Sequence, residues 1–314
     1  MTAFEVRRAS ELEAQPAARR WLVQDLWADQ AVGIVGGEPK CCKSFLALDL
    51  AVSVASGATC LRRFAPRRTG PVLLYAAEDA LHVVRARLEG ICQAAGVSFE
   101  RLDVHAITAP RVRLDLDGDR QRLERTVADL EPVLLVLDPF VRLHRVDENA
   151  ANEVAPILAY LRTLQREHGP AVLLVHHSRK GAGHARAGQA LRGSSELHAW
   201  GDSNLYLRRR QDELLLTIEH RAAPSGPDLA LRLDGADGRV ALHVAEAAPR
   251  APSEPADPLD RVEQALAEAK RPLSRRALRA ACRMRASTVG DALTELLADG
   301  RAVETDGGYL HGGS

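Results

Sequence analysis

A short apolar run at Ala31–Gly36 leads through a tight loop into a helical stretch at Ser44–Ala55. The run does not alternate with polar residues, which is typical of a strand buried on both faces of a parallel sheet. The loop from Gly36 to Ser44 contains two glycines and a proline. A buried strand, a loop and a helix in this order predict an α/β architecture with the loop at the carboxyl end of a strand.

The loop itself is close to the phosphate-binding pattern GxxxxGK[ST], which requires this strand–loop–helix context. Lys43 would reach the β- and γ-phosphates of a nucleotide, and the Ser44 hydroxyl would ligate Mg²⁺. Loop N–H groups and the helix N-terminus add a positive field. The alternative is an ordinary tight turn into a helix. The expected nucleotide-binding residues are Gly37, Glu38, Pro39, Lys40, Cys41, Cys42, Lys43, Ser44 and Phe45.

Cys42 occupies the position where the pattern has its second glycine. A side chain there costs about 1–2 kcal/mol if the backbone dihedral φ is positive. Cys41 and Cys42 also lie between Lys40 and Lys43, in a positive field that predicts a lowered thiol pKa and a reactive thiolate. Alternatively, both cysteines simply fit the loop.

Strands and helices alternate beyond the loop, which predicts βαβ units and a doubly wound sheet. Expected strands are Pro71–Ala77, Leu102–Thr108, Val133–Leu137 and Ala171–His176, and expected helices are Asp79–Ala95, Arg120–Leu130 and Asn152–His168. Later segments, separated by polar or Gly-containing turns, predict antiparallel strands. These are Ser203–Arg209, Glu213–His220, Leu229–Leu233 and Arg239–Val244.

Two domains are expected, at residues 1–245 and 259–314, joined by an Ala-, Pro- and Glu-rich linker at 246–258. In the second, helices are predicted at Arg261–Ala269, after a Ser274 cap, and after a Ser287 cap, followed by a hairpin around an Asp-Gly-Gly turn. This order resembles a winged helix.

Carboxylates and histidines follow three of the expected strands. Glu78 can deprotonate an attacking water, and Asp138 has the context of an acid that holds Mg²⁺. Because ligands of open α/β sheets bind outside the carboxyl ends of strands, both should face the phosphate loop. His177 could sense a γ-phosphate, although a histidine at a strand end is more often structural. An aspartate after a strand is likewise a common helix start.

Taken together, the segments Tyr75-Ala-Ala-Glu78-Asp79, Leu137-Asp138, His176–Gly181 and Leu191–Ser195 resemble the RecA/DnaB-type hexameric replicative helicases, especially the plasmid RepA-like helicases. The resemblance implies a RecA-like P-loop ATPase fold. It also implies that Glu78 is the catalytic carboxylate, Asp138 the Mg²⁺-site acid, and His177 the γ-phosphate sensor.

By the same resemblance, Arg192 would be the finger that reaches a neighbouring subunit's ATP, unless it is paired locally. The loop 179–190 would contact single-stranded DNA in a ring channel, although a solvated loop of this composition could equally do nothing. Cys42 and the second domain depart from the plasmid helicases.

Composition limits the kinds of partner and the cellular location that are expected. The 42 basic and 42 acidic residues balance, so no general attraction to polyanions is implied. No stretch is long enough to span a bilayer, and the N-terminus lacks the apolar run of a signal peptide, so no membrane partner and a cytoplasmic location are expected. Arginines cluster at 271–285, while Asp291 and Glu295 on the third helix oppose phosphate. DNA binding, protein contact or a structural cap therefore all remain open for the second domain.

The expected function is an ATP-hydrolysing, DNA-associated motor that binds ATP and Mg²⁺ and forms a ring. Two alternatives remain. One is an ATPase that loads or regulates another DNA protein without unwinding. The other is a nucleotide-dependent DNA-binding module in which Cys42 has abolished hydrolysis.

Overall fold

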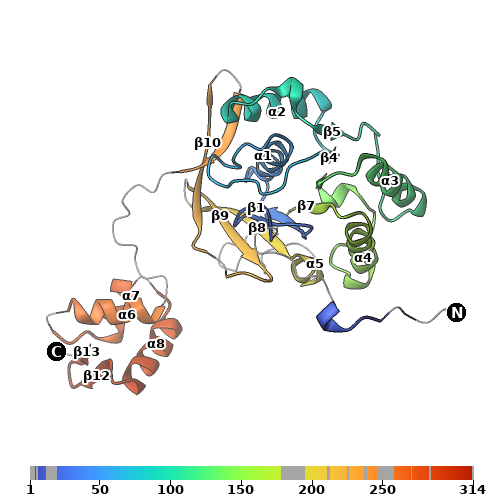
Figure 1. Ribbon diagram of the computed structural model, residues 1–314. Coiled ribbons are helices and arrows are strands. Elements are labelled where there is room, and N and C mark those ends of the chain that lie inside the picture. The colour runs from blue at the N-terminus through green and yellow to red at the C-terminus, as the bar shows by residue number, and fades with distance from the viewer. Residues whose placement is uncertain are drawn as a thin grey trace. The chain divides into compact units, whose positions relative to one another are not determined.

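The computed structural model describes residues 4, 6–11, 20–177, 195–210, 213–224, 226–236, 239–245, 258–269, 271–282 and 284–312. Two compact units comprise Met1–Glu246 and Ala247–Ser314 (Figure 1). The loop 179–190 with Arg192, and residues 246–257 of the expected linker, lie outside the described residues. Among those that are described, no helix has the length and apolar character needed to cross a bilayer.

The first unit is built on a nine-stranded sheet of order β11-β10-β9-β8-β3-β7-β6-β4-β5. Its parallel part consists of β3 (Val32–Gly37), β4 (Val72–Ala76), β5 (Val104–Ala106), β6 (Leu134–Asp138), β7 (Ala171–His177) and β8 (Ser203–Arg210). Strands β3 and β6 are buried along their whole length, as their apolar sequences predict. The expected strand at 102–108 is reduced to three residues.

Helices cover both faces of this sheet (Figure 1). They are α1 (Lys43–Ser56), α2 (Leu81–Ala95), α3 (Asp117–Leu130), α4 (Ala151–His168) and the short α5 (Ser195–Trp200). Alternate residues of each strand enter two separate cores. Leu134 and Val136 pack with α1 and α2, whereas Leu135 and Leu137 pack with α3 and α4. The doubly wound α/β fold expected from the sequence is therefore confirmed.

The antiparallel part extends from β8 through β9 (Glu213–His220) and β10 (Leu229–Ala236) to β11 (Arg239–Val244). The sequence predicts these four strands. It does not predict that they join the parallel sheet, which they do because β8 pairs in parallel with β3. A two-stranded sheet of β1 (Trp21–Val23) and β2 (Trp27–Ala28) precedes them. Short 3₁₀ helices among the described residues are η1 (Ala9–Glu11), η3 (Phe99–Arg101) and η4 (Phe140–Arg142).

The second unit contains α6 (Pro258–Ala267), α7 (Arg275–Cys282), α8 (Ala286–Ala298) and the hairpin β12 (Ala302–Thr305) and β13 (Gly308–His311) around its own core. The Ser274 hydroxyl accepts a hydrogen bond of 3.2 Å from the Ala277 N–H and caps α7. The Ser287 cap was wrong. Helix α8 begins two residues earlier than this cap requires, so Ser287 lies inside its first turn and Arg285 takes the capping position without a side-chain hydrogen bond.

Candidate nucleotide site

One cavity of about 300 Å³ lies where β3, β4, β6 and β7 end. These four strands are neighbours in the order β3-β7-β6-β4, and all run in the same direction. Their carboxyl ends therefore open on one edge of the sheet. The lining side chains are Lys40, Cys41, Cys42, Lys43, Ser44, Phe45, Glu78, Asp79, Arg87, Asp138, Val175 and His177.

Gly37 places the loop against β8. Its φ is 157°, and a Cβ there would lie 2.3 Å from the Leu207 carbonyl oxygen, which is an impossible approach to backbone. Glycine is thus required by the close packing of β3 on β8 as well as by the turn. The remaining expected loop residues, Glu38 and Pro39, follow directly and are only partly buried or exposed.

Cys42 adopts the conformation of the glycine that it replaces. Its φ is 61° and its ψ is 24°, in the left-handed region, and it occupies the N-terminal cap of α1. Lys40 is also left-handed, with φ of 65°. The backbone cost anticipated from the sequence is therefore present, at about 1–2 kcal/mol for Cys42, yet the loop keeps the turn that a glycine would make.

The Lys43 side chain is held inside the loop. Only 5% of its surface is exposed, and Nζ donates a hydrogen bond of 2.7 Å to the Glu38 carbonyl. Burial lowers the pKa of the ammonium, while the nearby Asp138 and Glu78 carboxylates oppose that change. A buried cation whose acceptor among the described residues is a neutral carbonyl is well suited to a polyanionic ligand.

Asp138, at the end of β6, faces the same cavity. Burial raises the pKa of its carboxyl group to about 6, and the negative charges of Asp79 and Glu78 act in the same direction. A hydrogen bond from the Ser44 side chain opposes that rise. The sequence predicts Ser44 and Asp138 as partners at a cation, and their oxygen atoms are ligands of the kind that Mg²⁺ prefers.

Two arginines that the sequence analysis did not identify pair with the acidic residues after β4. Arg142 Nε donates a hydrogen bond of 2.8 Å to Glu78 Oε1. Arg87 of α2 makes two hydrogen bonds to Asp79, and its guanidinium carbon lies 5.2 Å from the Phe45 ring centroid. No local spacing distinguishes these two from the other arginines of the chain, since both pairings depend on tertiary proximity.

His177 ends β7 opposite Gly37 of β3 and lines the cavity. The preceding His176 points to the other side of the strand and is buried. Its Nδ1 lies 3.7 Å from Glu148 Oε1, and the same oxygen is 3.7 Å from Nε2 of the buried His144. Of the two histidines at this strand end, His177 is therefore the one that lines the cavity.

The expectation of reactive thiols is not supported. Burial is the largest influence on both Cys41 and Cys42 and raises the pKa of each thiol, more than the charges of Lys43 and Arg209 lower it. Cys41 is only 2% exposed. The positive field at the helix N-terminus is present, but desolvation outweighs it.

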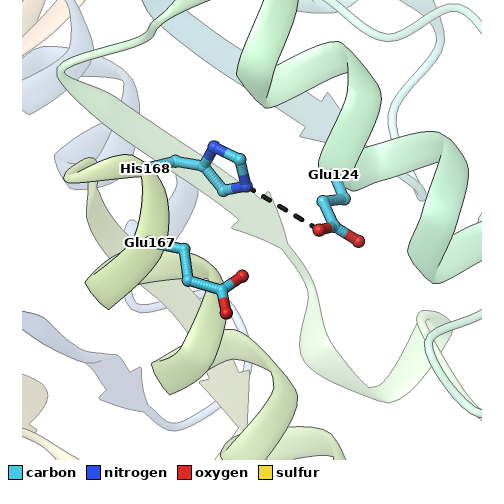
Figure 2. A group of neighbouring side chains, drawn as sticks. All are labelled: Glu124, Glu167 and His168. Carbon is cyan, nitrogen blue, oxygen red and sulfur yellow. Dashed lines mark ion pairs between the residues drawn. The ribbon is translucent and has the colours of Figure 1, made fainter. Parts of the chain in front are cut away.

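A separate group of side chains lies between α3 and α4. Potential ligand atoms of Glu124, Glu167 and His168 lie within 4.8 Å of one another (Figure 2). His168 Nε2 is 3.9 Å from a carboxylate oxygen of Glu124, and both glutamates are exposed. This spacing is what a surface ion pair with a neighbouring acid produces, and we interpret the group as such.

A mainly parallel, doubly wound sheet with a phosphate loop after β3 and acidic residues after β4 and β6 defines a P-loop NTPase of the RecA-like class. A family model described as an AAA domain matches residues 2–183, and the chain belongs to that family.

One solved structure agrees with this fold. The crystal structure of the RadB recombinase superposes with a TM-score of 0.50 at 16% identity, covering 69% of this chain and 92% of that one. A KaiC-like protein from the hyperthermophilic archaeon Pyrococcus horikoshii OT3 gives a TM-score of 0.48 at 13% identity, covering 71% and 93%.

Proposed function

We propose that the chain binds ATP with Mg²⁺, hydrolyses it, and works as a DNA-associated motor in a homo-oligomeric ring. The observation that carries the proposal is the convergence of Lys43, Ser44, Glu78, Asp138 and His177 on one cavity. A buried cation for phosphate, an oxygen pair for Mg²⁺ and a carboxylate for water are the parts that phosphoryl transfer to water requires.

The residues present fit ATP and its cation. Lys43 would hold the terminal phosphates together with the N–H groups of the loop, whose left-handed turns at Lys40 and Cys42 shape it for an anion. Ser44 and Asp138 would hold Mg²⁺, which neutralises charge on the phosphates when bound. Glu78 would accept a proton from the attacking water, and His177 would contact the γ-phosphate.

The ring and the DNA contacts rest on the sequence. Arg192 would complete a neighbouring subunit's site, and the loop 179–190 would bind single-stranded DNA. The second unit, with three helices and a hairpin in the order of a winged helix, would be an accessory domain. ATP hydrolysis requires only the residues of the described cavity, whereas motor activity also requires the ring and the DNA contacts. The two activities are therefore tested separately.

The test compares Lys43→Ala and Glu78→Gln with Arg85→Ala, which replaces an exposed arginine of α2 paired with Glu89. Lys43→Ala should lose ATP binding. Glu78→Gln should bind ATP but hydrolyse it about 10²–10⁴-fold more slowly, because it lacks the base. Arg85→Ala should match the wild type. Normal hydrolysis by Lys43→Ala would refute the nucleotide site.

A second measurement separates the motor from its alternatives. Hydrolysis with and without single-stranded DNA should be run beside native mass determination. A motor predicts a ring and stimulated hydrolysis. Weak hydrolysis that DNA does not stimulate would indicate a loading or regulatory ATPase, and ATP binding without turnover would indicate a binding module.

A further inference from the structure

The second unit carries an uninterrupted run of positive charge. Between Ala269 and Gly290 the sequence has seven basic residues and no acidic one. This run contrasts with the whole chain, whose 42 basic and 42 acidic residues balance. Positive charge is therefore concentrated in this segment of the second unit, and the structure shows where its described arginines lie.

The arginines in the middle of this run lie on one side of helix α7. It buries Leu278 and Cys282 in the core of the unit, whereas Arg275, Arg276 and Arg279 are exposed. At about 100° per residue, these three arginines fall within an arc of about 100° around the helix. We call them, with the exposed Arg271 just before α7, the α7 arginine surface.

These charges are available to a partner. In the part of the chain that the structure describes, Arg271, Arg276 and Arg279 make no ion pair. Arg275 is fixed in place, since its Nε donates a hydrogen bond of 2.9 Å to the Tyr309 hydroxyl and its guanidinium carbon lies 5.7 Å from the ring centroid. By contrast, Arg301 of the same unit pairs with Glu263. Unpaired arginines gathered on one face repel each other unless an anion accompanies them.

Charge on the next helix restricts how such an anion could bind. Asp291 and Glu295 are exposed on α8, the third helix of the unit, which would be the recognition helix in the winged-helix order proposed for this unit. Two carboxylates on that helix oppose insertion into a groove lined by phosphates. The α7 arginine surface lies on and just before the second helix instead, and among the described arginines of the run Arg285 alone stands at the start of α8.

Stacking residues are missing from the same stretch. Residues 269–290 contain no Phe, Trp or Tyr, and Tyr309 beneath Arg275 is only 4% exposed. Proteins that bind single strands without sequence preference combine charge with aromatic platforms. Duplex DNA, with about one charge per 1.7 Å and its bases already stacked, needs only the charge.

We propose that the α7 arginine surface binds the phosphate backbone of duplex DNA without reading its sequence, and that α8 does not enter the groove. The proposal extends the proposed DNA association, but it rests on residues separate from the nucleotide cavity. It can therefore be tested by DNA binding alone, with no nucleotide present.

The experiment measures binding of the full-length protein to a fluorescent 30-base-pair duplex between 50 and 200 mM salt, with EDTA and no nucleotide. Each lost phosphate contact should reduce the slope of log K against log salt by about 0.9. Arg276→Ala/Arg279→Ala should therefore lower the slope by about 1.8 and weaken binding at least tenfold at about 100 mM salt. Arg276→Lys/Arg279→Lys keeps the charge and should keep the slope.

Two controls make the outcome specific. Asp291→Asn/Glu295→Gln on α8 should bind equally well or more tightly, and Lys43→Ala should leave duplex binding unchanged even if hydrolysis is lost. A circular dichroism melt checks that each variant folds. An unchanged slope in Arg276→Ala/Arg279→Ala would overturn the proposal, as would a loss confined to a single-stranded 30-mer. Absence of duplex binding by the wild type at 50 mM salt would also overturn it, and would assign the surface to an acidic protein.

Discussion

Arg142 Nε donates a hydrogen bond of 2.8 Å to Oε1 of Glu78, the carboxylate proposed to activate water. The two side chains come from different connections, Glu78 from the end of β4 and Arg142 from η4 directly after Asp138. Both are well exposed, at 42% for Glu78 and 61% for Arg142. In the proposed mechanism, Glu78 would have to leave this partner, or share it, to take a proton from water.

The ion pair between Arg142 and Glu78 should have only a small effect on the rate of hydrolysis. Exposed ion pairs contribute about 0.2–1 kcal/mol, so releasing Glu78 in Arg142→Ala should raise kcat by at most about fivefold. Steady-state hydrolysis at saturating ATP measures this, with Arg85→Ala as the matched loss of an exposed arginine. A fall of a hundredfold would contradict the expectation and show that Arg142 takes part in the chemistry itself.

The two cysteines of the loop should respond in opposite ways to glycine. Cys42→Gly relieves a left-handed backbone and should raise the free energy of unfolding by about 0.5–1 kcal/mol, with hydrolysis retained. Cys41 has no positive φ and a buried side chain, so Cys41→Gly should lower stability by about 1–2 kcal/mol. Urea unfolding of both variants measures the difference. Equal destabilisation by both would show that the Cys42 side chain contributes more by packing than its backbone costs.

The loop thiols should be slow to react at neutral pH. Because burial raises the pKa of Cys41 and Cys42, little thiolate is present to attack an alkylating reagent. Mass spectrometry after a timed pulse of N-ethylmaleimide should show labelling of both residues far below that in the urea-unfolded chain. Rapid labelling that ATP suppresses would restore the reactive-thiolate interpretation made from the sequence.

Asp138 should make the nucleotide-free protein less stable as the pH rises. The pKa of its carboxyl group is about 6 in the folded chain and about 3.9 in an unfolded one. Its contribution to stability is therefore fully present below the unfolded pKa and is lost as the pH rises through about 6. At about 1.4 kcal/mol per pKa unit, the loss is about 3 kcal/mol.

Urea unfolding in EDTA at pH 5 and pH 8 measures this effect. The wild type should lose more stability between these values than Asp138→Asn, which has no carboxyl group to ionise, and Asp138→Asn should be the more stable protein at pH 8. Parallel pH profiles for the two proteins would contradict the assignment of a raised pKa to Asp138.

Much of the first unit follows from local sequence. Uninterrupted apolar runs such as Leu134–Leu137 form strands buried on both faces, and the loop at Gly37–Ser44 joins a strand to a helix as its pattern predicts. Glu78 and Asp138 are expected to lie close together because parallel strands bring their carboxyl ends to one edge, and both line the cavity. These features need only periodicity and chain order, which the sequence contains directly.

Other features were decided by residues far apart in the chain. The parallel pairing of β8 with β3, which makes Gly37 indispensable, joins segments about 170 residues apart. The pairs Glu78–Arg142 and Asp79–Arg87 depend on which helix turn faces the cavity. The thiol pKa values and the raised pKa of Asp138 follow from burial, which exists only once the whole sheet is covered. Sequence pattern and spacing thus determined the helices and strands and which strand ends carry the site residues. Desolvation and long-range contacts, which have no local signature in the sequence, determined the electrostatics of the site.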